Sequence, residues 1–118
     1  MQAGRELDVK VAEAFGWVVD SHDPIYWQDN EWYPIPEFST TWFGMGVLVE
    51  GAPEEGIFLS FEHVCGGYVG LAYDMRETNG PVNPIYSDDD HRGIKSAPHA
   101  IALVYLKVKG TAIYHKRK

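Results

Sequence analysis

Five histidines and 17 acidic residues supply the side chains that most often bind metals or transfer protons. His22 precedes Asp23, and the run Asp88-Asp89-Asp90-His91 places carboxylates beside an imidazole, a donor set that could bind a cation. The sequence contains no HxxxH, CxxC or HExxH spacing of the kind that zinc sites use. We therefore expect no bound metal or cofactor, and a solvated loop for the acidic run.

The spacing of the single cysteine and of the hydroxyl residues matches no known nucleophilic site. Cys65 precedes two glycines at an expected hairpin turn, where neither a base nor a thiolate-stabilising group is evident. Ser39 begins a run of hydroxyl residues typical of a helix N-cap, and no GxSxG motif or phosphate-binding loop occurs. We therefore expect no catalytic residues and a protein that is not an enzyme. A small hydrolase that uses His91 or His99 with the acidic run is a weaker alternative.

Aromatic residues supply the strongest indication of a binding surface. Six of them lie within 18 positions, and a small hairpin cannot bury all of them on one face by alternation. Exposed Trp and Tyr side chains anchor protein interfaces and stack on bases, whereas buried ones would form a second small core against the following helix. The six residues are Tyr26, Trp27, Trp32, Tyr33, Trp42 and Phe43.

These features define a set of candidate binding residues. Trp27 or Trp32 would stack on a ligand, and Arg92 or Lys95 would supply positive charge for a phosphate. His99 lies in the first turn of an expected helix, where the helix dipole favours the neutral imidazole. The predicted set is Trp27, Trp32, Tyr33, Arg92, Lys95 and His99.

The charge distribution argues against nucleic acid as a partner. The chain has 10 Lys and Arg against 17 Asp and Glu, a net charge of −7. We expect residues 115–118 to form a frayed basic tail, and without Lys116, Arg117 and Lys118 the remaining body has a net charge of −10. Binding of duplex DNA or RNA requires a basic face. An acidic body instead suits contact with a basic surface on a partner protein or mimicry of nucleic acid, or it serves solubility alone.

Length and composition predict one domain. The 118 residues, of which 45% are hydrophobic, suit a single domain, 1–118, with its own core. No apolar run approaches the roughly 18–20 residues that cross a bilayer, and the charged N-terminal segment is unlike a signal peptide. A lone cysteine cannot form an internal disulfide, which suits a reducing compartment, so we expect a cytoplasmic protein without a membrane partner.

Apolar periodicity predicts three helices. The first covers 3–15 and is closed by Gly16, which suits the left-handed conformation of a helix end. The second covers 42–50 after the hydroxyl caps. The third begins at a cap on Ser96 and stops at Gly110.

Turn residues between aromatic and β-branched runs predict two hairpins. A short strand at 17–19 precedes an aromatic hairpin over 25–33, with a loop of about four residues at 28–31. The predicted fold is therefore α+β, a small antiparallel sheet of two hairpins packed with three helices.

The second hairpin covers 57–75, where apolar residues alternate with others. A two-residue loop at 66–67 would pair Phe61 with Ala72, whereas a three-residue loop would pair Phe61 with Tyr73. We prefer the three-residue loop because it keeps one face of this hairpin apolar.

Three segments that together cover nearly the whole chain resemble a known family. They run from Gly4-Arg5-Glu6-Leu7-Asp8 through Val11-Ala12-Glu13 to Phe15-Gly16-Trp17, from Phe38-Ser39-Thr40 through Trp42 to Leu48-Val49-Glu50, and from Ala97-Pro98-His99-Ala100-Ile101 through Leu106-Lys107. In this order they resemble the phage ABA sandwich domain, a family of short phage and prophage proteins. This sequence departs from the family pattern at Gly44 and Gly46, where the family's middle helix usually has better helix formers. It also departs in the long loop over 76–95, and loops of this length are often functional or mobile.

The resemblance implies an antiparallel sheet packed with helices and a phage or prophage origin, without shared catalytic residues. On this basis we expect a non-enzymatic binding protein in the host cytoplasm that counters a bacterial defence system. It would bind a host defence protein or sequester a small nucleotide signal. A virion or assembly accessory protein is the alternative. Because so many aromatic side chains need covering, we also expect a homo-oligomer.

Overall fold

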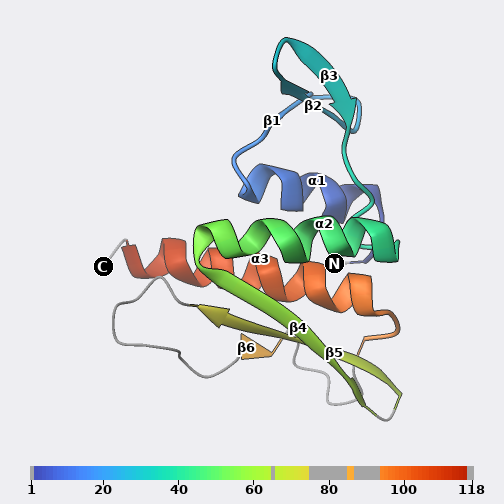
Figure 1. Ribbon diagram of the computed structural model, residues 1–118, viewed down its shortest axis with the longest axis vertical. Helices are drawn as coiled ribbons and strands as arrows, with labels where there is room; N and C mark the ends of the chain where they lie inside the picture. Colours follow the sequence, from blue (N-terminus) through green and yellow to red (C-terminus); the bar gives the residue numbers. More distant parts are fainter. Residues whose placement is uncertain (1, 65, 75–84, 87–93, 117–118) are drawn as a thin grey trace.

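Two sheets lie on opposite sides of three helices in the computed structural model, which describes residues 2–64, 66–74, 85–86 and 94–116 (Figure 1). The helices are α1 (Arg5–Ala14), α2 (Trp42–Gly51) and α3 (Ala97–Lys116), and the short 3-10 helix η1 (Ala52–Glu55) follows α2. One antiparallel sheet contains β1 (Val18–Val19), β2 (Ile25–Gln28) and β3 (Glu31–Pro34), and the other contains β4 (Ile57–Val64), β5 (Gly67–Asp74) and β6 (Ile85–Tyr86). The predicted α+β class is confirmed, with the two hairpins in separate sheets.

The end of α1 follows from a single glycine. Gly16 has a φ of 87°, a left-handed conformation that a residue with a Cβ rarely adopts. Its N–H donates to the carbonyl of Glu13 at 2.9 Å, and the N–H of Trp17 donates to the carbonyl of Ala12 at 3.1 Å. This pair of hydrogen bonds ends the helix and directs the chain into β1, as the sequence predicts.

A buried hydrogen-bonded group joins the start of α1 to the segment before α2. Asp8 and Ser39 are almost fully buried. Asp8 Oδ1 accepts hydrogen bonds from the Ser39 backbone N–H at 2.8 Å and from its hydroxyl at 2.7 Å, while Ser39 Oγ accepts from the N–H of Gly4 at 2.9 Å. Asp8 Oδ2 is buried and has no hydrogen-bond partner among the residues that the structure describes. The group therefore fixes α1 relative to the chain that leads into α2.

The two glycines of α2 have different environments. Thr41 caps the helix, because its Oγ1 accepts from the N–H of Gly44 at 2.9 Å. A Cβ on Gly44 would collide with the backbone carbonyl of Glu37, whereas Gly46 has open space around it. Close packing explains the first glycine and not the second.

The register of the second sheet differs from both predicted alternatives. Val64 pairs with Gly67, and Phe61 pairs with Gly70. The predicted pairings of Phe61 with Tyr73 or Ala72 are therefore wrong. Cys65, at the predicted turn, lies outside the described residues.

Helix α3 explains this register, because it lies directly on the small residues of β5. A Cβ on Gly70 would lie 2.9 Å from the carbonyl carbon of Ala100, closer still to its oxygen, and 3.0 Å from Cγ1 of Val104. Ala72 on the same face of β5 is fully buried and pairs with Leu59. Strand β5 therefore presents small residues to α3, and Leu71 lies on the opposite face of the sheet. The preferred register would have placed Leu71 on the same face as Leu59 and Phe61.

The start of α3 agrees with the sequence, but its end does not. Ser96 Oγ accepts a hydrogen bond from the N–H of His99 at 3.3 Å, which confirms the predicted cap. The helix continues through Gly110 to Lys116, so the predicted stop is wrong. Gly110 has a helical rather than a left-handed φ, and a helical glycine costs about 1 kcal/mol relative to alanine without ending a helix. Residues 117–118 of the expected basic tail lie outside the described chain.

Buried apolar side chains from α1, α2, β4, β5 and α3 and from the segment before α2 form one core cluster around Phe38 and Tyr105. The segment after α2 is attached to this core, because Glu55 accepts hydrogen bonds from the hydroxyl of Tyr105 at 2.6 Å and from Lys109 Nζ at 2.9 Å. No helix in the described part of the chain combines the length and apolarity needed to cross a membrane.

Candidate functional site

The first sheet projects from the helices beyond α1, on the side away from β4 and β5 (Figure 1). We call this sheet, residues 18–34, the arm. Gln28 pairs with Glu31, so the turn consists of Asp29 and Asn30 alone, with φ values of 50° and 68°. Two left-handed residues form the tight turn that matches strand twist, and Asp and Asn tolerate this conformation. The expected four-residue loop is therefore two residues long.

The inner face of the arm is attached to the core through a series of aromatic contacts. The ring centroids of Tyr33 and Tyr26 lie 5.8 Å apart, and Tyr26 stacks on Trp17 at 4.4 Å. Trp17 stacks on Phe15 at 5.4 Å, and Phe15 packs against the buried Tyr105 of α3 at 5.0 Å. These contacts hold the arm in a defined position relative to the helices.

The outer face of the arm carries a row of exposed apolar side chains, which we call the tryptophan face. Val18 pairs with Trp27, which pairs with Trp32, so all three point to the same side. Their exposed fractions are 61%, 41% and 46%. The two indole rings meet edge to face at 5.2 Å, a favourable geometry for aromatic pairs. The face is therefore preorganised and open to a partner.

A hollow of about 220 Å³ lies beside the tryptophan face. It has room for one side chain, and three of its six lining residues are aromatic. Its lining consists of Gly16, Trp17, Val18, Tyr26, Trp27 and Gln28.

Tyr33 lies on the inner face, opposite the two tryptophans. Its hydroxyl donates a hydrogen bond of 2.6 Å to Glu31 Oε2. This bond to the carboxylate raises the pKa of the Tyr33 phenol above its ordinary value, and partial desolvation adds to the shift. The predicted aromatic set is therefore divided, with Trp27 and Trp32 on one face and Tyr33 on the other.

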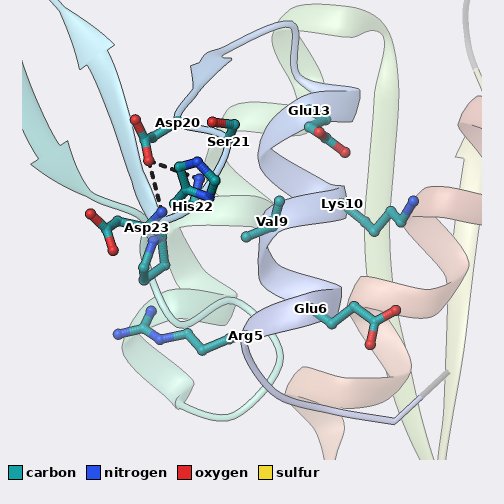
Figure 2. Close-up of a pocket in the computed structure, with 10 residues that line it drawn as sticks. Arg5, Glu6, Val9, Lys10, Glu13, Asp20, Ser21, His22 and Asp23 are labelled. Carbon is teal, nitrogen blue, oxygen red and sulfur yellow. Dashed lines mark hydrogen bonds between the residues drawn. The ribbon is translucent and has the colours of Figure 1, made fainter.

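A groove of about 370 Å³ separates α1 from the loop at the base of the arm (Figure 2). Arg5 and Val9 lean from α1 toward this loop, whereas Lys10 extends away from it (Figure 2). Arg5 Nη1 donates to the carbonyl of Ile35 at 3.2 Å, so it also holds the segment after β3. The loop contributes Asp20, Ser21, His22, Asp23 and Pro24.

The carboxylate of Asp20 organises the loop rather than a reaction. Its Oδ2 accepts the backbone N–H groups of His22 at 2.9 Å and of Asp23 at 2.8 Å (Figure 2). The bond from Asp23 and then that from His22 lower the pKa of Asp20 below its ordinary value. Asp20 is therefore ionised near neutral pH and cannot act as a general acid there.

The other three members of the predicted site do not lie on the arm. Ile94 forms a bridge with Tyr68 of β5, so the adjacent Lys95 and the start of α3, with His99, belong to the side of the second sheet. The arm projects from the other side of the helices (Figure 1). Arg92 lies outside the described residues. The structure therefore brings Trp27 and Trp32 together without Lys95 or His99.

The remaining candidates for chemistry are not assembled in the described part of the chain. His91 and Asp88–Asp90 lie outside it, and its residues contain no group of three His, Cys, Asp or Glu side chains placed to hold a metal. Sequence reasoning missed Val18 as part of the exposed face. The only signal in the sequence was the short strand predicted at 17–19. The sequence does not specify how such a strand pairs with β2, and so does not specify which of its residues share a face with Trp27.

Comparisons with protein-family models, with curated proteins and with solved structures find no match for this chain. The resemblance to the phage ABA sandwich domain therefore stays a prediction.

Proposed function

We propose that this chain is a non-enzymatic binding protein that contacts a partner protein through the tryptophan face of its arm. The observation that carries the proposal is the pair of exposed indoles, Trp27 and Trp32, held edge to face on a projecting sheet. Tryptophans are the residues most enriched among those that dominate binding energy. The aromatic contacts from Tyr26 to Tyr105 preorganise the surface, which lowers the entropy cost of binding.

Within this proposal the partner is a host defence protein, and the chain acts in the host cytoplasm as a phage or prophage product. This context rests on the sequence resemblance alone. A nucleotide signal is a weaker ligand for this surface, because residues 18–34 contain no Lys or Arg to meet a phosphate. Self-association through the same face is a rival use of it.

The test compares Trp27→Ala/Trp32→Ala with the matched control Trp42→Ala. Trp42 is also exposed but lies on α2, where it contacts Phe61. Each tagged protein is incubated with bacterial lysate, captured proteins are identified by mass spectrometry, and the purified partner is titrated against each variant. We expect the arm variant to bind roughly 30-fold or more weakly, the effect of losing a dominant contact of about 2 kcal/mol, and the control to bind like the wild type.

Folding is checked in the same samples by circular dichroism, because truncating the aromatic pair also costs about 0.5–1.5 kcal/mol of stability. A folded arm variant that binds every captured protein as tightly as the wild type does would refute the proposal. Native mass spectrometry reports a bound nucleotide or a homo-oligomer, and co-purification with virions would support the accessory role instead.

A further inference from the structure

The arm contains four acidic residues and no Lys or Arg of its own, and Arg5 of α1 lines the groove at its base. Between residues 18 and 34 the acidic residues are Asp20, Asp23, Asp29 and Glu31, and every Lys and Arg of the chain lies outside this range. Asp20 and Asp23 lie at the base of the arm, and Asp29 and Glu31 lie at its turn. Asp23 and Asp29 therefore lie beyond the two ends of the tryptophan row, whereas Glu31 lies on the inner face of the arm, where its carboxylate accepts the hydrogen bond from Tyr33.

The edges of the arm are poorly suited to strand addition. The N–H of Ile35 donates to the carbonyl of Pro24 at 2.9 Å, so these two residues are a hydrogen-bonded pair of the β2–β3 ladder. Hydrogen-bonded and non-hydrogen-bonded pairs alternate along an antiparallel ladder. Trp32 and Pro34 therefore turn their backbone groups outward. Proline has no N–H, so Trp32 alone offers a donor at this edge of β3. The opposite edge, β1, is two residues long.

From these two observations we infer that the tryptophan face docks flat on a cationic, apolar surface of a partner protein. The inference rests on the proposed function, whose surface it uses. Indole faces attract Lys and Arg side chains through cation–π contacts, and the carboxylates at the two ends of the arm steer such a surface during encounter. The hollow beside Trp27 offers an aromatic wall to one such side chain. An acidic nucleic-acid backbone and a second copy of this acidic arm are both disfavoured by the same charges.

The experiment uses the full chain and three probes: a 12-residue peptide of alternating Lys and Leu, its Glu and Leu counterpart, and a 12-nucleotide single-stranded DNA. Binding is followed by tryptophan fluorescence and by isothermal titration at two salt concentrations. We expect the Lys–Leu peptide to bind, more weakly at high salt, and the other two probes not to bind.

Two triple variants separate local from total charge. Asp23→Asn/Asp29→Asn/Glu31→Gln neutralises three carboxylates of the arm, and Asn at position 29 suits the left-handed turn. Glu50→Gln/Glu54→Gln/Glu62→Gln removes the same charge from exposed positions off the arm. We expect the arm variant to bind the Lys–Leu peptide roughly three- to tenfold more weakly, with a shallower salt dependence. The control variant should stay within about twofold of the wild type.

Binding of the Glu–Leu peptide or the DNA at least as tightly as the Lys–Leu peptide would overturn the inference. Equal losses of peptide affinity in the two triple variants would also overturn the inference, because the net charge of the chain, and not the charge on the arm, would then control binding. If Trp27→Ala/Trp32→Ala abolishes binding of the host protein while the arm charge variant leaves it unchanged, the cationic partner fails but the proposed function stands. If the tryptophan variant binds that protein normally, the proposed function itself fails.

Discussion

Replacing Gly70 with alanine tests how closely α3 approaches the second sheet. The new Cβ would lie 2.9 Å from the carbonyl carbon of Ala100 and 3.0 Å from Cγ1 of Val104, where ordinary contact begins at 3.4 Å. The nearest atoms belong to the backbone of α3, which cannot rotate away as a side chain could. Because the carbonyl oxygen of Ala100 lies closer still to this Cβ, helix and sheet must separate by more than half an ångström. A gap of about 0.5–1 Å loses about a quarter to a half of the dispersion energy of each affected contact.

The expected magnitude combines two opposing effects. Overpacking of a core costs about 1–3 kcal/mol, and the reduced freedom of the unfolded chain returns about 0.4–1 kcal/mol for a Gly→Ala change. We expect a net loss of about 1–2 kcal/mol in the free energy of unfolding. With a typical m-value, this loss lowers the urea midpoint by about 0.5–1 M.

Gly46→Ala is the matched control, because Gly46 lies within α2 with open space around it. Here the same change should stabilise the protein by about 1 kcal/mol through helix propensity. Both variants are unfolded in urea and followed by circular dichroism, with unchanged m-values required for the comparison. If Gly70→Ala unfolds at the wild-type midpoint or above it while Gly46→Ala is stabilised, then α3 does not lie on Gly70, and the register of β4 and β5 is wrong.

Two further predictions concern the buried group at Asp8 and the hydroxyl of Tyr33. Ser39→Ala removes the hydroxyl that donates to Asp8 Oδ1 and should lower the free energy of unfolding, measured in urea, by about 1.5–3 kcal/mol. The control Ser21→Ala, at an exposed position, should change this free energy little. Equal stabilities of the two variants would contradict the reasoning. The raised pKa of Tyr33 should return toward its ordinary value in Glu31→Ala, as followed by phenolate absorbance against a Tyr33→Phe blank. Because the pKa of Tyr33 is higher in the folded state, its hydrogen bond stabilises the arm fully at pH values below the ordinary tyrosine pKa. This stabilisation is lost as the pH rises through the raised pKa. An unchanged Tyr33 pKa in Glu31→Ala would assign the shift to another cause.

The sequence by itself determined the elements whose signals are local. Gly16 ends α1, one of the three predicted hydroxyl residues caps α2, and Ser96 caps α3, because each of these roles depends on residues within one turn of the chain. The sequence also identified Trp27 and Trp32, since residues that flank a short hairpin loop are close in space wherever the hairpin lies. These residues carry the candidate site.

Only the tertiary structure decided the long-range relations. The register of β4 and β5 depends on the approach of α3 to Gly70, a contact 30 positions away in the sequence, and a shift of one residue exchanges the two faces of a strand. The same holds for the arm, where the pairing with β1 adds Val18 to the exposed row and the stacking on Trp17 turns Tyr26 inward. Lys95 and His99 are separated from the tryptophans because the chain places the two hairpins on opposite sides of the helices. Local chemistry therefore indicated the candidate binding residues, and packing determined which of them lie together.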